Sequence, residues 1–205
     1  MTKLLFIWIP KCAGSSICKY YKLNNQANNE NLYNFDNNSN VTFGHADINI
    51  LLKNSIILSD FYNKSFKFCI VRNPYDRAVS LFFYLGLNRD YSFKEWVKYL
   101  YKNRYNIPKN SDININTYKD INNQWNLMVS WIPDDIDKIY YFENINTIVN
   151  DINKEINVFR NDKLGIENAA NSHKHYIEYY DEYIQNMIYE IYKEDFIRFN
   201  YSKNL

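Results

Sequence analysis

The chain has 205 residues, of which 46% are hydrophobic, and a formal net charge of +1. This length and composition predict a single folded domain over residues 1–205 with a substantial core, and the near-zero charge argues against a broad basic face for nucleic acid. The three cysteines form neither a CxxC pair nor a zinc-type spacing, so we expect free thiols in a reducing compartment.

The first predicted element is a buried strand near the start of the chain. Leu4 to Ile9 is an uninterrupted apolar run that stops at Pro10, a pattern typical of a central parallel strand. Small residues follow, and a helix is expected to continue through Ile17. Strand, short loop and helix N-terminus together indicate an anion site, because the first helical N–H groups lack partners within the helix and the helix dipole is positive there.

The residues of this loop suit an anion. Gly14 allows a close backbone approach, Ser15 and Ser16 offer hydroxyl donors, and Lys11 places a positive charge at the mouth. An ordinary strand–turn–helix with a serine N-cap is the structural alternative. The loop is not a Walker A motif, because its lysine precedes the glycine, so ATP with magnesium is not the favoured ligand.

Strands and helices alternate along the rest of the chain. A polar surface loop is expected at 24–40, further strands at 41–43, 65–72 and 138–142, and helices at 48–53, 75–87, 92–104, 117–131, 145–156, 181–192 and 194–199. Ser92 and Glu95 predict a capping box at the start of one helix. This alternation predicts an α/β domain with a mainly parallel sheet.

A second anion-binding pattern lies where the strand at 65–72 meets the next helix. Arg72 ends the strand, at the edge where ligands of open α/β sheets bind, and Pro74 suits the first helical turn. Arg77 and Ser80 are three residues apart and therefore share one helix face. A guanidinium and a serine hydroxyl side by side can both donate hydrogen bonds to a phosphate. An arginine paired with a carboxylate, next to a surface serine, would give the same pattern. Two anion sites predict a ligand with two anionic ends.

Both stretches resemble motifs of one known family. IPKCAGSS at 9–16 is similar to the 5′-phosphosulfate loop of sulfotransferases, and IVRNPYDRAVSLFFY at 70–84 is similar to their 3′-phosphate motif. Weaker similarities point to the branch that includes the Golgi carbohydrate sulfotransferases and run along most of the chain. They are FGHA at 43–46, NQW at 123–125, YFEN at 141–144 and a tail from 179 to 201.

The resemblance implies a P-loop-like three-layer α/β/α domain that binds 3′-phosphoadenosine 5′-phosphosulfate (PAPS). It implies sulfuryl transfer to an acceptor hydroxyl, expected on a carbohydrate, with adenosine 3′,5′-bisphosphate as the product. Lys11 would stabilise the bridging oxygen as the bond to sulfur breaks, and no metal is expected. By motif match, the residues expected at the 5′-phosphosulfate are Lys11, Cys12, Ala13, Gly14, Ser15 and Ser16, and those at the 3′-phosphate are Arg72 and Ser80.

His45 is the predicted base, because the acceptor hydroxyl must lose its proton and histidine is the usual acceptor. A histidine in this region serves as base in part of the related branch. Asp47 is the alternative base, and a buried histidine that hydrogen-bonds the loop is the structural alternative for His45. Arg77 is expected to brace the loop and Glu143 to be structural.

Other positions have weaker predictions. Ser172 or Lys174 would contact the nucleotide if the segment before the last helices closes over it. Gln124 and Trp125 are expected either at the acceptor side or in the core. The acceptor pocket itself is expected from the loops at 24–40 and 105–115.

Two other functions fit parts of the sequence. A P-loop kinase or phosphotransferase would need a lysine after the glycine and an acidic magnesium ligand, and neither is found. A catalytically inactive binding module is the other, but Lys11, Arg72 and Ser80 are all present. The chain also shows no signal peptide and no apolar run near 18 residues, unlike the Golgi relatives, so we expect no membrane anchor and a cytoplasmic bacterial or viral enzyme.

Overall fold

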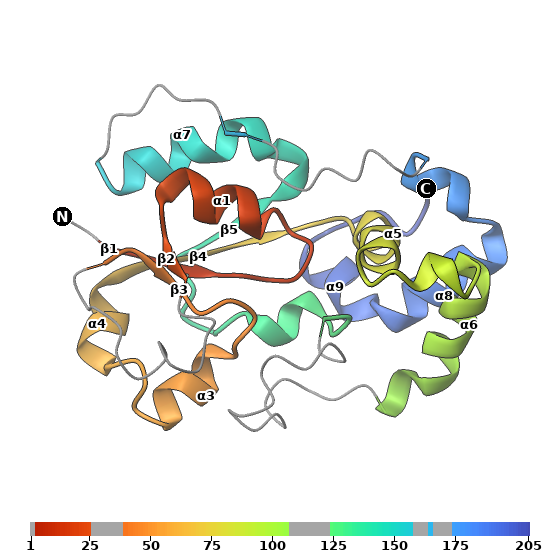
Figure 1. The fold of residues 1–205 in the computed structure, drawn as a ribbon, viewed down its shortest axis with the longest axis horizontal. Helices are drawn as coiled ribbons and strands as arrows, with labels where there is room; N and C mark the ends of the chain where they lie inside the picture. The colour runs from red at the N-terminus through yellow and green to blue at the C-terminus, as the bar shows by residue number, and fades with distance from the viewer. Residues whose placement is uncertain (1–2, 26–38, 107–123, 158–163, 166–173) are drawn as a thin grey trace.

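The computed structural model describes residues 3–25, 39–106, 124–157, 164–165 and 174–205 (Figure 1). A central sheet of five strands has the order β2-β3-β1-β4-β5, and every neighbouring pair is parallel. The strands are β1 (Lys3–Ile7), β2 (Asn24–Asn25), β3 (Val41–Thr42), β4 (Ser65–Val71) and β5 (Lys138–Tyr141). The long strands β1 and β4 therefore lie side by side at the centre, and their carboxyl ends meet at one edge.

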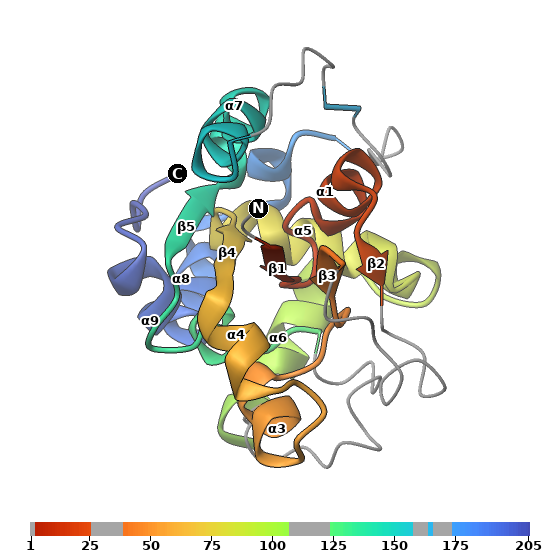
Figure 2. The same cartoon turned by 90° about the vertical axis from the view of Figure 1, so that its left-hand side faces the viewer.

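Helices cover both faces of the sheet. The helices α1 (Gly14–Tyr21) and α7 (Ile145–Glu155) lie on one face, and α3 (Ile48–Lys53) and α4 (Ser59–Lys64) lie on the other (Figures 1 and 2). The two central strands, β1 and β4, are largely apolar because both of their faces are buried; in β4, for example, Phe68, Cys69, Ile70 and Val71 are fully buried. The predicted three-layer α/β/α architecture with a parallel sheet is confirmed.

A second group of helices lies beyond the carboxyl ends of the strands (Figure 1). It contains α5 (Pro74–Tyr84), α6 (Phe93–Asn103), α8 (Glu182–Ile191) and α9 (Lys193–Arg198), which share their own hydrophobic cluster. Short 3₁₀ turns complete the fold: η1 (Leu87–Arg89), η2 (Arg104–Asn106), η6 (Met128–Trp131), η7 (Phe142–Asn144) and η8 (Tyr176–Tyr179). The carboxyl ends of the strands therefore lie between the sheet with its covering helices and this second group of helices. Ligands of open α/β sheets bind at this end of the strands.

Several predicted boundaries are confirmed by local chemistry. Pro74 occupies the first turn of α5, after Asn73 accepts a hydrogen bond from the Tyr75 N–H. The capping box of Ser92 and Glu95 starts α6 as predicted. The helix expected to reach residue 87 ends at Tyr84 instead, because the chain turns at Gly86 with a left-handed φ of 69°.

Three expectations need correction. The strand expected to run to Ile9 ends at Ile7, and residues 24–25 of the expected surface loop form the edge strand β2, which pairs with β3. The short helix α4 was not predicted. The helix expected at 117–131 is wrong where the structure describes it, because 124–127 is non-helical and only the 3₁₀ turn η6 follows; residues 26–38 and 107–123 lie outside the described part. Within the described part, no helix is long and apolar enough to cross a membrane.

Candidate active site

The loop between β1 and α1 has an unusual backbone. Lys11 and Ala13 both have left-handed φ angles, of 64° and 62°, which are uncommon for residues other than glycine. Cys12 between them does not, and α1 begins at Gly14. Alternation of this kind is found in anion-binding loops, where successive backbone N–H groups face one side, although the Cys12 N–H here donates to the Ile9 carbonyl (3.3 Å). The anion site at this loop stays a prediction.

The start of α1 adds to this site. The first helical hydrogen bond runs from the Ile17 N–H to the Ala13 carbonyl (3.1 Å), so the N–H groups of residues 14–16 precede the helical ladder. The helix dipole is positive at this end. The N-cap is Ala13 and has no side-chain capping bond, so the alternative of an ordinary serine N-cap is wrong.

Two arginines hold the loop from the side of α5. The Arg77 Nε donates to the Pro10 carbonyl (3.1 Å), and the Arg72 Nη1 donates to the Lys11 carbonyl (3.0 Å). Two consecutive peptide planes are thereby fixed, which offsets the strain of a left-handed Lys11. The two sequence motifs are thus joined by direct hydrogen bonds.

Gly14 is required for a reason that the sequence did not indicate. A Cβ atom at this position would lie 1.7 Å from Nε1 of Trp8, whose indole covers the start of α1. The φ of Gly14 is not left-handed, so its backbone conformation is open to other residues. Space for the indole, rather than backbone freedom, is what excludes a side chain here.

Lys11 lies at the mouth of the loop, half-buried, with its ammonium 4.0 Å from the centroid of the Tyr84 ring. Burial, and then the nearby charge of Arg72, lower the pKa of Lys11 to about 8. Among the described residues it has no carboxylate partner. A cation that is partly desolvated and paired only with an aromatic ring is well suited to an incoming anion.

Arg72 is already partly engaged. Its Nε and Nη2 donate to the two carboxylate oxygens of Asp76, both at 2.8 Å, and its guanidinium stacks 4.1 Å from the Phe142 ring centroid. With the bond to Lys11, three of its five N–H donors are used, which leaves one on each terminal nitrogen. Ser80 is buried on α5, not on the surface, and its hydroxyl bonds no other described residue. The carboxylate pairing weighed as an alternative is present, and the 3′-phosphate role of Arg72 and Ser80 stays a prediction.

Arg77 braces the loop, as predicted. Its side chain is 1% exposed and donates to three carbonyl oxygens, those of Pro10, Gln124 and Asn126, at 2.8 to 3.1 Å. A guanidinium that is buried and donates to three backbone carbonyl groups holds the backbone in place, which is a structural role.

His45 is placed next to the loop by a turn at Gly44, whose φ is 59°. Its Nδ1 lies 2.8 Å from the Trp8 carbonyl, and its ring meets the edges of Trp8 and Trp131 at centroid distances of 5.5 and 6.2 Å. A carbonyl can only accept, so Nδ1 carries the proton and Nε2 keeps its lone pair. Burial lowers the pKa of His45, so the ring is neutral at pH 7. The hydrogen bond from Nδ1 to the Trp8 carbonyl fits the structural role considered for His45. The same bond leaves Nε2 unprotonated, which is the tautomer that a base needs.

The remaining candidates are structural or lie outside the described residues. Asp47 caps α3 by accepting from the Asn49 N–H (2.8 Å), which does not support its role as base. Glu143 accepts from the Asn73 N–H and the Tyr201 hydroxyl, as a structural residue would. Burial raises the pKa of the Cys12 thiol to about 12, so it is protonated and unreactive at neutral pH. Lys174 is exposed, and Ser172 lies outside the described part.

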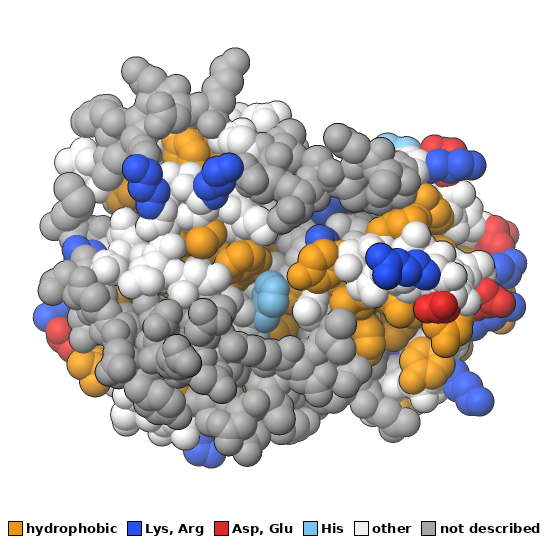
Figure 3. Space-filling view, in the orientation of Figure 1, with side chains coloured by type: hydrophobic (Ala, Val, Ile, Leu, Met, Phe, Trp, Pro, Cys, Tyr) orange, Lys and Arg blue, Asp and Glu red, His pale blue; other side chains and the backbone are white. Residues whose placement is uncertain are grey.

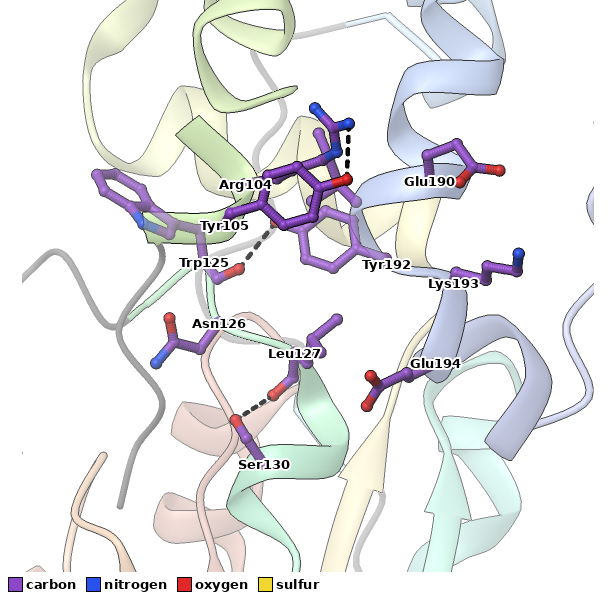
Figure 4. A pocket seen from close by; sticks show the side chains of 11 residues that line it. Arg104, Tyr105, Trp125, Asn126, Leu127, Ser130, Glu190, Tyr192, Lys193 and Glu194 are labelled. Atoms are coloured by element: carbon purple, nitrogen blue, oxygen red, sulfur yellow. Dashed lines mark hydrogen bonds between the residues drawn. The ribbon is translucent and has the colours of Figure 1, made fainter. Parts of the chain in front are cut away.

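A pocket of about 470 Å³ lies between the end of α6, the segment before η6 and the junction of α8 and α9 (Figure 4). Its lining includes the aromatic rings of Tyr105 and Trp125, and it balances two cations against two carboxylates. The charged residues are Arg104, Lys193, Glu190 and Glu194. Trp125, which had two predicted roles, both lines this pocket and packs against the helical core. The charge balance suits a neutral polar ligand better than a doubly anionic nucleotide.

Other residues at the site had no sequence signal as site residues. Trp8 was assigned to the strand, yet it contacts both Gly14 and His45. Met128 was assigned to a helix, yet its sulfur lies 3.8 Å from the Cys12 sulfur.

Basic and hydrophobic side chains surround a recess on the face seen in Figure 3. No cluster of three or more histidine, cysteine or acidic side chains suited to a metal occurs among the described residues.

Comparison with known proteins gives one match. A sequence model described as the sulfotransferase family matches residues 1–202, nearly the whole chain. No curated protein and no solved structure matches the chain.

Proposed function

This chain belongs to the sulfotransferase family, and we propose that it transfers the sulfuryl group of PAPS to an acceptor hydroxyl on a carbohydrate. The observation that carries the proposal is the loop at 10–16. Its features are two left-handed residues, arginines on its carbonyl groups and, at its mouth, the Lys11 ammonium, which has no carboxylate partner among the described residues; together they suit an anion. PAPS, a substrate with anionic groups at both ends, supplies the activated sulfuryl group.

We propose that the loop and Lys11 bind the reacting end. The backbone N–H groups at the start of α1 would hold the 5′-phosphosulfate by hydrogen bonds and the helix dipole. As the bond between sulfur and the bridging oxygen breaks, its electron pair stays on the phosphate oxygen, where negative charge develops. The Lys11 ammonium would stabilise that charge, an interaction stronger in the transition state than in the ground state.

His45 would act as the base. Its Nε2, left with a lone pair by the Nδ1 contact with Trp8, would accept the proton of the acceptor hydroxyl as the oxygen attacks sulfur. The lowered pKa keeps this nitrogen unprotonated at neutral pH. The proton thus moves to the imidazole and the sulfuryl group to the acceptor oxygen.

Arg72 and Ser80 would hold the other end of the nucleotide. The two unused N–H donors of Arg72 and the buried Ser80 hydroxyl are suited to a 3′-phosphate. Asp76 would keep the guanidinium plane fixed, because both of its oxygens bind it.

The carbohydrate acceptor is supported by the resemblance and by the pocket at α6 and η6. Aromatic faces beside carboxylates suit a neutral sugar, which stacks on the ring and donates hydroxyl hydrogen bonds. Glu190 is exposed, so Glu190→Gln should leave the fold unchanged. We expect it to raise the KM for a neutral oligosaccharide acceptor while the affinity for adenosine 3′,5′-bisphosphate stays the same, as measured by steady-state kinetics and calorimetry. An unchanged KM would place the acceptor elsewhere.

The central test is calorimetric titration with adenosine 3′,5′-bisphosphate beside ATP with magnesium. We expect the bisphosphate to bind more tightly, and preference for ATP would support a kinase instead.

Lys11→Ala should lower the transfer rate by about 10² to 10³-fold, as loss of one transition-state contact typically does. Lys53→Ala on α3, an exposed lysine away from the loop, is the matched control. Bisphosphate binding with no effect of Lys11→Ala would leave an inactive binding module.

A further inference from the structure

The segment from Gln124 to Val129 belongs to no strand or α-helix, yet its peptide groups are held in place by buried side chains. Arg77 donates to the carbonyls of Gln124 (2.8 Å) and Asn126 (3.0 Å). The Tyr192 hydroxyl donates to the Trp125 carbonyl (3.0 Å). At the other end of the segment, both oxygens of Asp195 accept backbone N–H groups, those of Met128 and Val129, at 2.9 Å each.

This held segment touches each part of the candidate active site. The Met128 sulfur lies 3.8 Å from the Cys12 sulfur in the anion loop and accepts from the Arg72 N–H at 3.5 Å. Trp131, at the end of η6, meets the His45 ring edge-on at 6.2 Å. Trp131 follows the segment in η6. A shift of the segment would therefore move Met128, which contacts Cys12 in the loop, together with Trp131, which contacts His45.

The groups that hold the segment are fully enclosed. Arg77 and Tyr192 are 1% exposed and Asp195 is 0% exposed. The carbonyl groups of the segment face the buried cation, and its N–H groups face the buried anion. The charged and titratable groups around Asp195 are Arg77, which favours its charge, Glu194 beside it on α9, Tyr192 at the α8–α9 junction and the Cys12 thiol of the loop. No water can replace an interaction lost here without opening the core.

We propose that Asp195 is a positioning residue for sulfuryl transfer, acting through Met128 and Val129 on the anion loop and His45. It does so from α9, near the end of the chain, and it touches no reacting group itself. The proposal rests on the function proposed above.

The test compares Asp195→Asn with wild type. Asparagine keeps the shape but removes the charge and one acceptor, so one of the two N–H bonds is lost. We expect about a tenfold weaker affinity for adenosine 3′,5′-bisphosphate and about a tenfold lower kcat, in line with one lost charged hydrogen bond. Glu182→Gln, an exposed acid at the start of α8, is the control and should change neither.

A pH profile separates positioning from a purely structural role. In the folded wild type, affinity for the bisphosphate should fall as Asp195 takes up a proton, near the pKa of about 6 to which burial raises it. The phosphates of the ligand titrate near pH 6 with both proteins, so the ratio of wild-type to Asp195→Asn affinity is the quantity to follow. This ratio should fall as the pH drops through about 6, at temperatures where circular dichroism finds both proteins folded. A folded Asp195→Asn with wild-type affinity, kcat and pH profile would overturn the inference.

A second variant decides the matter if Asp195→Asn does not fold. Tyr192→Phe removes only the hydroxyl that bonds the Trp125 carbonyl, and it should weaken bisphosphate binding by a few-fold. Unchanged binding would overturn the inference. Failure of the wild type to bind the bisphosphate would instead overturn the proposed function.

Discussion

The candidate anion loop at 10–16 and the segment at 124–131 both contact Arg77. Each begins with irregular backbone, at 10–13 and 124–127, and continues into a helical turn, the start of α1 and η6. The loop is joined directly to β1 and α1 in the sequence, and Arg72 and Arg77, 61 and 67 positions away, hold two of its carbonyl groups. In the described part of the chain, the segment has no strand or α-helix next to it, and residues from α5, α9 and the α8–α9 junction, 47 to 67 positions away in the chain, hold it. Its shape therefore exists only in the assembled core.

This difference separates two ways of building a site. A loop between strand and helix keeps its anion-binding character wherever that pair forms, because the N–H groups and the dipole belong to the helix itself. A segment held by side chains moves when any one of them changes. In the proposed function, the loop would stabilise the developing charge, and the segment would fix the position of the loop.

Replacing Arg77 should have the largest effect on both regions. Arg77→Met fills a similar volume but leaves the carbonyls of Pro10, Gln124 and Asn126 without donors and Asp195 without its nearby cation. Breaking a buried charged network of this kind costs about 3 to 5 kcal/mol. Urea unfolding followed by circular dichroism measures this loss.

Arg198→Met provides the control, because Arg198 is exposed in the last turn of α9. Its effect should stay within about 0.5 kcal/mol, as for most surface substitutions. Equal unfolding midpoints for the two variants would show that the loop and the segment do not depend on Arg77.

The pH dependence of stability should report on Asp195, which holds the segment. Burial raises the pKa of Asp195 to about 6 in the folded state, above the ordinary value near 4 of the unfolded chain. The folded state thus binds this proton more tightly, so stability should rise as the pH falls from 7 toward 4 and be lost again as the pH rises through 6. Two units correspond to about 3 kcal/mol at most.

His45 contributes in the opposite direction, because burial lowers its pKa and protonation then favours the unfolded chain. The difference in unfolding free energy between wild type and Asp195→Asn removes the His45 contribution, which both proteins share. That difference should shift in favour of wild type by about 2 to 3 kcal/mol between pH 7 and pH 4. A difference that does not change with pH would mean that Asp195 is not held as its surroundings indicate. The expected shift would instead mean that the charged Asp195 is a cost to stability at neutral pH that is retained for positioning, a known compromise at functional sites.

The contrast between the regions also explains what the sequence could predict. The run from the end of β4 through Asn73 and Pro74 into α5 was predictable, because strand, cap and first turn are adjacent in the chain. The strand, loop and helix around 10–16 were predictable for the same reason, and so was the bracing role of Arg77; anion binding by the loop stays a prediction. The parallel sheet followed from alternating strands and helices.

The segment at 124–131 could not be predicted in this way. Its apolar residues were interpreted as a helix, but side chains distant in sequence take the carbonyl and N–H groups that a helix would pair internally. Nothing local distinguishes the buried Asp195 from the exposed Glu194 beside it. Likewise, the contact of Trp8 with Gly14 depends on how β1 turns into the loop, which the apolar pattern does not encode.

The smallest expected effect tests that contact in the loop. Gly14→Ala places a methyl group against the indole of Trp8, and such overpacking costs about 1 to 3 kcal/mol. The φ of Gly14 is acceptable for alanine, so without the indole the same substitution should stabilise the protein by about 0.4 to 1 kcal/mol. Trp8→Leu shortens the side chain, and Gly14→Ala should then change sign in that background. A double-mutant cycle of unfolding free energies measures this coupling. The same penalty in both backgrounds would mean that Gly14 is required by the loop backbone itself, and the loop would then be as locally determined as its sequence motif suggests.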